Sequence, residues 1–112
     1  MATQLTKLTD DVLRFRDARD WKQFHNPKDL ALALSIEAAE LNELFLWKSP
    51  DAADRKLIAE ELADVFIYSL LLAHESGVDI ADAVEKKLRA NKKKYPVKKA
   101  KGSARKYTEF NK

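Results

Sequence analysis

The chain has 112 residues, no cysteine and a formal net charge of +3. This length predicts one domain with a single core, small enough that association of copies would help it to bury apolar surface. The lack of cysteine excludes disulfide bonds and thiolate metal sites and agrees with a reducing compartment. Because the first residues are polar and the apolar runs are short, we expect a soluble, cytoplasmic protein without a membrane partner.

The charge is distributed unevenly along the chain. Residues 1–85 hold 9 Lys/Arg against 17 Asp/Glu, a net of −8, whereas residues 86–112 hold 12 Lys/Arg and one Glu, a net of +11. A cationic segment after an anionic body can bind a polyphosphate, pair with the body or contact nucleic acid. We expect a helical domain over residues 1–96 and a basic C-terminal tail over residues 97–112, which has few large apolar residues for a core of its own.

Apolar periodicity and capping residues predict helices and no strand. The first helix is expected over residues 3–20, where apolar residues recur at a 3-4-3-4 spacing. Asn26 and Pro27 mark the start of a second helix, which we expect to continue to about residue 48. The residues between these two helices are expected to form a loop.

Two further helices complete the prediction. The third begins near residue 51, or after Asp54 as a rival cap, and ends before Gly77. The fourth is capped by Asp79 and ends near residue 95, just before a proline. The predicted fold class is therefore an all-α bundle of four main helices.

The third helix is apolar on most of its circumference rather than along one stripe. A helix of this kind must be covered on more than one side, and three short partner helices are barely sufficient for that. We therefore expect an oligomer, either a homodimer or a homotetramer, that is held together along this helix, with Leu71 facing a partner.

Four carboxylates stand in two short phrases, Glu37-Ala38-Ala39-Glu40 and, after twenty intervening residues, Glu61-Leu62-Ala63-Asp64. Two helical residues three positions apart lie roughly 60° apart, on one helix face. Carboxylates on the apolar side of a helix are costly to desolvate unless a cation or a donor compensates them. The pairs therefore favour a divalent metal, and oxygen ligands suit Mg²⁺, with Mn²⁺ as a possible substitute. The alternative is that both pairs lie on solvated helix faces.

Aromatic residues lie close to the carboxylates in the predicted helices. Trp47 lies only about 20° around the helix from Glu40, and Tyr68 lies about 40° from Asp64, so both rings share the faces of the carboxylates. Either these rings are ordinary core aromatics, or they form a platform for a nucleobase beside a metal that holds phosphates. The segment Trp21-Lys22-Gln23-Phe24-His25 is a better candidate for ligand binding, because a loop residue need not belong to a core.

Taken together, these phrases resemble those of a known family. Glu-x-x-Glu followed by Glu-x-x-Asp on a helical chain of this length resembles the MazG-like all-α nucleoside triphosphate pyrophosphohydrolases. The phrases at 19–25, 44–48, 60–68 and 102–109 are similar to those of the dCTP pyrophosphatase subgroup. The resemblance extends from about residue 13 to residue 109.

This resemblance implies hydrolysis of a dNTP, dCTP-like or modified, to the monophosphate and pyrophosphate, with Mg²⁺ required, as a house-cleaning reaction of the nucleotide pool. It implies that the metal ligands are Glu37, Glu40, Glu61 and Asp64. Glu40 is also the residue that we expect to orient the attacking water. The residues implied to line the nucleotide pocket are Trp21, Gln23, Phe24, His25, Trp47, Tyr68, Asn91 and Lys94.

Two other functions stay open at this point. One is a different reaction on the same fold, phosphoribosyl-ATP pyrophosphohydrolysis, against which the Trp-x-Gln-Phe-His phrase counts. The other is a helical nucleic-acid-binding module without enzymatic activity. Because the body is net acidic and the tail has few interleaved aromatic residues, we do not expect nucleic acid as a partner.

Overall fold

The computed structural model describes residues 3–110, which form helices and turns without a strand. The all-α class expected from the sequence is confirmed for these residues. By its contacts the chain divides into two compact units, Met1–Val78 and Asp79–Lys112, which are described separately. The two residues at each end, which the sequence assigns to a polar N-terminus and to the basic tail, lie outside the described residues. The expected boundary at residue 96 stays a prediction.

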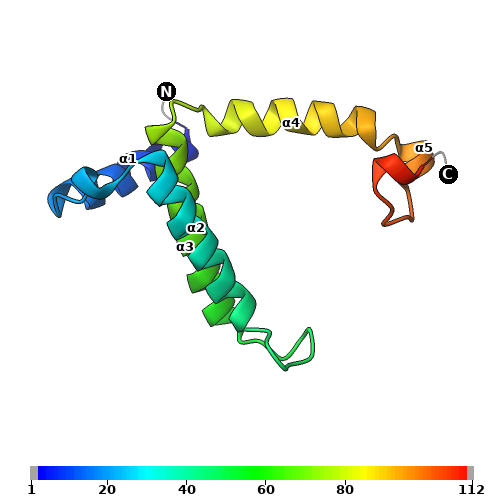
Figure 1. The fold of residues 1–112 in the computed structure, drawn as a ribbon, viewed down its shortest axis with the longest axis horizontal. Helices are drawn as coiled ribbons and strands as arrows, with labels where there is room; N and C mark the ends of the chain where they lie inside the picture. The colour runs from blue at the N-terminus through cyan, green and yellow to red at the C-terminus, as the bar shows by residue number, and fades with distance from the viewer. Residues whose placement is uncertain (1–2, 111–112) are drawn as a thin grey trace. The chain divides into compact units, whose positions relative to one another are not determined.

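The first unit contains three helices, α1 (Gln4–Ala18), α2 (Pro27–Glu43) and α3 (Arg55–Glu75). The helices α2 and α3 lie side by side, and α1 packs against α3 (Figure 1). Between α1 and α2 the chain makes one short 3₁₀ turn, η1 (Lys22–Phe24). The buried apolar residues of the unit are Leu30, Leu70, Leu71 and Ala73. Three of these four belong to the second half of α3, so the core lies toward that end of the helix.

Local capping sets where the helices begin. The side chains of Thr3, Asn26, Asp54 and Asp79 each accept a backbone N–H from the first turn of the helix that follows. Such a side chain satisfies one of the N–H groups that have no partner within the helix. The predicted starts at Asn26 and Asp79 are confirmed, and of the two rival starts of the third helix the structure has the one at Asp54.

The end of α2 differs from the sequence prediction. Its last helical residue is Glu43, five residues before the expected end at residue 48. The backbone then tightens into turns, with hydrogen bonds from the N–H of Leu46 to the carbonyl of Glu43 and from the N–H of Lys48 to the carbonyl of Phe45. Trp47 has a φ of 62°, a left-handed conformation that cannot continue an α-helix. The predicted length was wrong because periodicity does not detect such a turn.

The position of Leu71 also corrects an expectation. Leu71 is only 5% exposed within the single chain, so it belongs to the core of the first unit rather than to a surface that faces a partner. The apolar residues that α3 does expose lie nearer its N-terminus, at Leu57, Leu62 and Phe66. The expected subunit interface along α3 stays a prediction, with these residues as its candidates.

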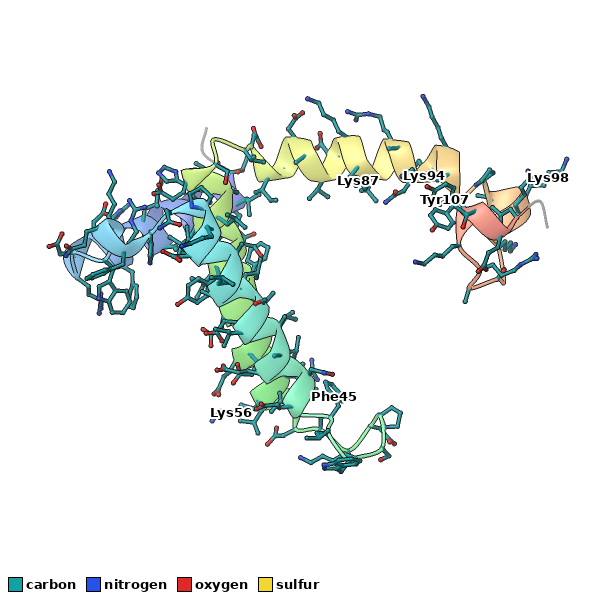
Figure 2. The ribbon with its side chains drawn as sticks, in the orientation of Figure 1. Phe45, Lys56, Lys87, Lys94, Lys98 and Tyr107 are labelled. Atoms are coloured by element: carbon teal, nitrogen blue, oxygen red, sulfur yellow. The ribbon has the colours of Figure 1, made fainter. Side chains whose placement is uncertain are left out.

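The second unit consists of α4 (Ile80–Lys94), the short helix α5 (Val97–Ala100) and the 3₁₀ turn η2 (Tyr107–Glu109). An aromatic cluster holds the end of this unit together, because the ring of Tyr95 meets Tyr107 and Phe110 edge-on, with ring centroids 5.8 and 5.6 Å apart. Figure 2 shows Lys94 beside Tyr107, with its Nζ atom 5.0 Å from the ring centroid. This cluster was not expected from the sequence, although its three aromatic residues were the visible signal.

None of the described helices combines the length and the apolar character that a transmembrane helix needs.

Candidate metal centre and ligand-binding residues

Carboxylates from α2 and α3 converge where the two helices lie side by side. Glu37 comes from the middle of α2, and Glu61 and Asp64 come from the first half of α3. One carboxylate oxygen from each of these three residues can be chosen so that all three oxygens lie within 4.8 Å of one another. This spacing is small enough for one cation to contact all three groups, so the structure brings together three of the four predicted metal ligands.

Two oxygens of this group are buried without a partner. The Oε2 atoms of Glu37 and Glu61 are both shielded from solvent, and neither has a hydrogen-bond partner among residues 3–110. A buried carboxylate oxygen without a donor or cation is costly, and native folds leave few such atoms. A hard divalent cation prefers oxygen ligands of this type, so the residues present fit Mg²⁺ or Mn²⁺.

The crowding of negative charge shows in the pKa values of the same groups. Burial, followed by the neighbouring Glu40 carboxyl, raises the pKa of Glu37 to about 7. Burial and the charge of Glu40 also raise the pKa of Glu61. Each shift means that the carboxylate releases its proton less readily than an isolated carboxylate does when no cation compensates the crowded charge. A metal ion would compete with that proton for the same oxygens.

Glu40 differs from the other three carboxylates. It is exposed and is not one of the three residues whose oxygens converge, yet its charge contributes to the raised pKa of both Glu37 and Glu61. A carboxylate in this position is accessible to water and close to the candidate metal centre. Its predicted roles, as a metal ligand and in orienting water, stay predictions.

Tyr68 lies one helical turn after Asp64 on α3. Burial, and then the negative charge of Glu37, raises the pKa of the Tyr68 hydroxyl above its ordinary value of 10.0. The hydroxyl therefore keeps its proton at neutral pH and stays a hydrogen-bond donor beside the carboxylates. The structure thus places this predicted pocket residue close to the candidate metal centre.

The aromatic loop between α1 and α2 is partly exposed. The ring of Trp21 meets Phe15 edge-on, with centroids 5.7 Å apart, and Phe24 projects into solvent. The Nδ1 atom of His25 is buried and has no hydrogen-bond partner in the described part of the chain. Glu37 lies ten residues beyond Pro27, so about 15 Å of helix axis separates this loop from the carboxylates. The structure does not bring the two groups together within one chain.

Trp47 is neither a core residue nor a residue of the α2 face. It is 95% exposed and follows the end of the helix, so the interpretation as a core aromatic is wrong for the single chain. The positive φ of a bulky residue is strained and uncommon, and such residues gather at functional sites. Trp47 borders a hollow of about 560 Å³ together with α2 residues that include Ala39 and Glu43. Its role in ligand binding stays a prediction.

The remaining predicted pocket residues, Asn91 and Lys94, belong to α4 in the second unit. Asn91 is half-buried, and Lys94 extends over the ring of Tyr107. Their expected contacts with sugar and phosphate stay predictions.

Residues 32–110, which include both carboxylate phrases, match the model of the MazG-like family. The chain belongs to this family. The match begins after the aromatic loop, so it includes the candidate metal centre and α4 but not residues 21–25. This MazG-like chain therefore has a family assignment that does not depend on its aromatic loop.

Two further comparisons describe what this MazG-like chain is similar to. It is 47% identical over 104 residues to dCTP pyrophosphatase 1 of Mus musculus and 44% identical to dCTP pyrophosphatase 1 of Homo sapiens. Each alignment covers 86% of this chain but only 61% of the relative, so the chain spans less than two thirds of their length. The crystal structure of a pyrophosphatase from Archaeoglobus fulgidus matches with a TM-score of 0.79 and 36% identity, covering 86% of this chain and 95% of that one.

Proposed function

We propose that this chain is a Mg²⁺-dependent nucleotide pyrophosphohydrolase that converts a dCTP-like or modified dNTP to the monophosphate and pyrophosphate, and so cleans the cytoplasmic nucleotide pool. The observation that carries this proposal is the convergence of Glu37, Glu61 and Asp64, with two buried oxygens that lack a partner. The relatives named dCTP pyrophosphatase 1 support the substrate class, and the match to a solved pyrophosphatase supports the reaction.

In this proposal the converging carboxylates hold the cation. Glu37 and Glu61 would use the oxygens that are buried without partners, and Asp64 would complete the set. When bound there, Mg²⁺ supplies positive charge that offsets the negative charge on the phosphate oxygens as the reaction proceeds.

In the proposed reaction, Glu40 would act on the water. Its exposed carboxylate would accept a proton from a water molecule, whose oxygen forms a bond to the α-phosphorus. The bond between the α-phosphorus and the oxygen that bridges it to the β-phosphorus breaks, and pyrophosphate leaves with the electron pair of that bond. The water oxygen remains on the nucleoside monophosphate. Tyr68, which stays protonated, can donate a hydrogen bond to a substrate oxygen beside the carboxylates.

The exposed rings would hold the base. Trp21, Phe24 and Trp47 each leave much of a ring exposed in the single chain, and every nucleobase presents a face on which such a ring can stack. On α4, Asn91 and Lys94 would contact the sugar and a phosphate, as the resemblance implies.

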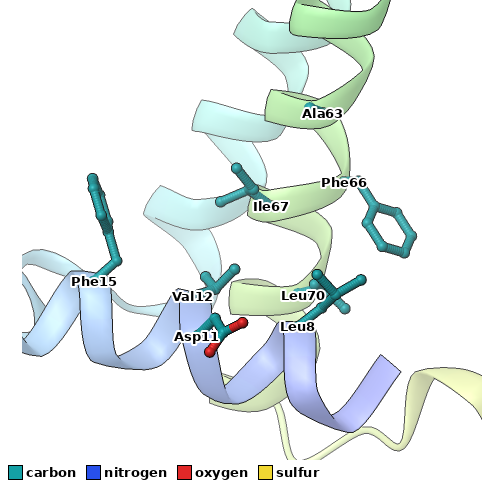
Figure 3. Close-up of a pocket in the computed structure, with 8 residues that line it drawn as sticks. All are labelled: Leu8, Asp11, Val12, Phe15, Ala63, Phe66, Ile67 and Leu70. Carbon is teal, nitrogen blue, oxygen red and sulfur yellow. The ribbon is translucent and has the colours of Figure 1, made fainter. Parts of the chain in front are cut away.

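A second copy of the chain would bring the separated parts together. The aromatic loop lies about 15 Å along α2 from the carboxylates, so a neighbouring subunit is a ready source of the rings for a given site. An apolar groove of about 480 Å³ lies between α1 and α3. Figure 3 shows residues that line it, such as Leu8, Phe15 and Phe66. An exposed apolar groove of this kind is typical of a subunit interface, and we propose a homodimer or homotetramer.

Product analysis tests the reaction directly. The chain is incubated with Mg²⁺ and a panel of canonical and modified dNTPs and phosphoribosyl-ATP, and the products are separated by ion-exchange chromatography. We expect monophosphate and pyrophosphate in equal amounts from dCTP or a related nucleotide. Release of single phosphate with a diphosphate product, or turnover of phosphoribosyl-ATP alone, would overturn the proposal.

Light scattering coupled to size-exclusion chromatography tests the assembly. We expect the wild type to be a dimer or tetramer at micromolar concentration, and Phe66→Asp to shift it toward the monomer, because a charge in an apolar interface is costly. Val97→Asp, at an exposed apolar residue of the second unit, serves as the matched control. A wild type that is monomeric and fully active would contradict the proposed assembly.

A further inference from the structure

The loop between α1 and α2 holds the side-chain amide of Gln23 in a defined orientation. The Nε2 atom of Gln23 donates to the backbone carbonyl of Asp20 at 3.0 Å and to Oδ2 of the same residue at 3.1 Å. A glutamine amide nitrogen carries two hydrogens, so Asp20 can engage both of them. Asp20 stands after the end of α1 with a φ of 54°, a conformation that Asp adopts more readily than most residues.

The opposite orientation of this amide is unfavourable. If the amide were turned over, Oε1 of Gln23 would face the two acceptor oxygens of Asp20 with no hydrogen between them. In the orientation that the structure has, Oε1 is the group left for a ligand, and no hydrogen bond to it is found within residues 3–110. A side chain that ordinarily both donates and accepts is here restricted to accepting.

The same loop provides a face for stacking. The ring of Trp21, two residues before Gln23, rests against Phe15, and the guanidinium of Arg19 lies over the Phe15 ring at 3.7 Å from its centroid. Backbone hydrogen bonds from Phe24 to Trp21 and from His25 to Lys22 close the turn. The loop therefore carries an aromatic ring and an oriented acceptor two residues apart on one short, internally bonded segment.

We propose that Asp20 is a positioning residue that orients Gln23 so that it recognises the exocyclic amino group of a base. This inference rests on the proposed function and names a determinant of base selection within it. Cytosine carries an exocyclic amino donor at the position where uracil and thymine carry a carbonyl acceptor. If Gln23 can only accept, its Oε1 atom binds the amino group of cytosine. When the base is uracil, Oε1 faces the carbonyl oxygen of the base instead, and neither oxygen has a hydrogen bond. The loop thus selects cytosine bases over uracil bases.

Steady-state kinetics on dCTP and dUTP test this inference. We expect the wild type to favour dCTP in kcat/KM by at least about tenfold. Asp20→Gly keeps the backbone carbonyl and tolerates the positive φ, but it frees one amide hydrogen of Gln23, which can then donate to a carbonyl. The dCTP to dUTP ratio should fall about tenfold, mainly because dUTP becomes a better substrate. Asp10→Asn, which removes an exposed aspartate from the middle of α1, should keep the wild-type ratio.

Damage to the fold would lower turnover of both nucleotides alike, so the ratio isolates base reading. Gln23→Met removes the amide that accepts the hydrogen bond and should also reduce the dCTP to dUTP ratio of kcat/KM. If Gln23→Met reduces it and Asp20→Gly leaves it unchanged, Asp20 does not set the orientation and the inference is overturned. A wild type that hydrolyses dCTP and dUTP equally well also overturns it but leaves the proposed function intact, whereas failure to hydrolyse any dNTP refutes the proposed function.

A measurement without substrate checks the orientation itself. In ¹⁵N-labelled protein, the side-chain NH₂ protons of Gln23 should exchange with water more slowly than those of an unbonded amide, because Asp20 can engage both of them. In Asp20→Gly at least one of them should exchange faster. Unchanged exchange in this variant would overturn the inference, whatever the kinetics show.

Discussion

Helix α3 carries partly buried carboxylates in its first half and at its C-terminal end, and the two places differ in how the charge is compensated. Near the C-terminal end, Glu75 accepts a hydrogen bond at 2.8 Å from Arg16, whose side chain is 4% exposed and also bonds Asp17 at 2.9 Å. Near the N-terminal end, Glu61 lies beside Glu37 and Asp64, and two buried oxygens of this group have no partner in the described residues.

This contrast separates a structural ion pair from a candidate site. At Glu75 the chain itself supplies the cation, so the partly buried carboxylate and the buried Arg16 compensate each other when the protein folds. At Glu61 the chain supplies more carboxylates instead, and the cost of burying them remains until a cation arrives from outside. The same residue type on one helix therefore stabilises the fold at one end and is available for a ligand at the other.

The largest effect is expected from breaking the uncompensated group. Glu37→Gln, Glu61→Gln and Asp64→Asn should each lower kcat/KM with Mg²⁺ by at least about 10⁴-fold, equivalent to more than 5 kcal/mol of transition-state stabilisation. Metal-free unfolding should show that these variants are folded, because each removes one of several like charges that repel one another.

Glu60→Gln, at the exposed neighbour of Glu61, is the matched control and should keep activity near the wild-type value. If two of the three site variants retained near-normal turnover with Mg²⁺, the convergence of these carboxylates would not be the metal centre.

Breaking the compensated pair should instead affect stability. Glu75→Leu leaves the buried Arg16 with Asp17 alone, which should lower the free energy of unfolding by about 3 kcal/mol, the low end for a broken buried ion pair. Glu75→Gln keeps an acceptor for Arg16 and should cost only about 1 kcal/mol. Urea unfolding of both variants measures the difference. Equal stability of Glu75→Leu and the wild type would show that the pair is not what holds α1 to α3.

Trp47 tests whether an exposed ring serves the site. Stacking contributes about 1–3 kcal/mol per base, so Trp47→Ala should raise KM by roughly 5- to 150-fold and leave kcat nearly intact. Because the ring is 95% exposed, its removal makes no cavity in the single chain, and the melting temperature should stay close to that of the wild type. Leu46→Ala, at the exposed neighbour, is the control. A large fall in melting temperature with unchanged KM would assign Trp47 to an interface instead.

The last expected effect concerns pH. The pKa of Glu37 is raised from 4.5 to about 7 in the folded chain, so the folded state binds more protons than the unfolded state between these values. Metal-free stability should therefore be greatest at the acid side of this window and fall as the pH rises through it. In EDTA, urea unfolding between pH 5 and pH 8 should show this fall for the wild type and a weaker one for Glu37→Gln.

Glu43→Gln, at an exposed glutamate of the same helix, should follow the wild type. Added Mg²⁺ should stabilise the wild type more at pH 8 than at pH 5, since protons compete for the same oxygens. Equal stabilisation at both pH values would contradict a cation at these carboxylates.

Local sequence patterns predicted the all-α class, the starts of the second and fourth helices and the two carboxylate phrases. These features depend on interactions within a few residues. Asn26 and Asp79 cap helices through hydrogen bonds to N–H groups three residues away, and an i, i+3 spacing places two carboxylates on one face of any α-helix. Local patterns of this kind are visible without knowing which helices pack together.

Which groups are buried, and which neighbours they contact, depends on how the helices pack together. The periodicity of α3 could not show that Leu71 faces the core, nor that Glu37 and Glu61 each bury an oxygen without a partner. The end of α2 at Glu43, which exposes Trp47, and the bonds from Gln23 to Asp20 depend on backbone turns that no periodicity encodes. Burial depends on packing between segments that are far apart in the chain. The neighbours of a side chain in that packing set its desolvation cost and its role in the fold or the site.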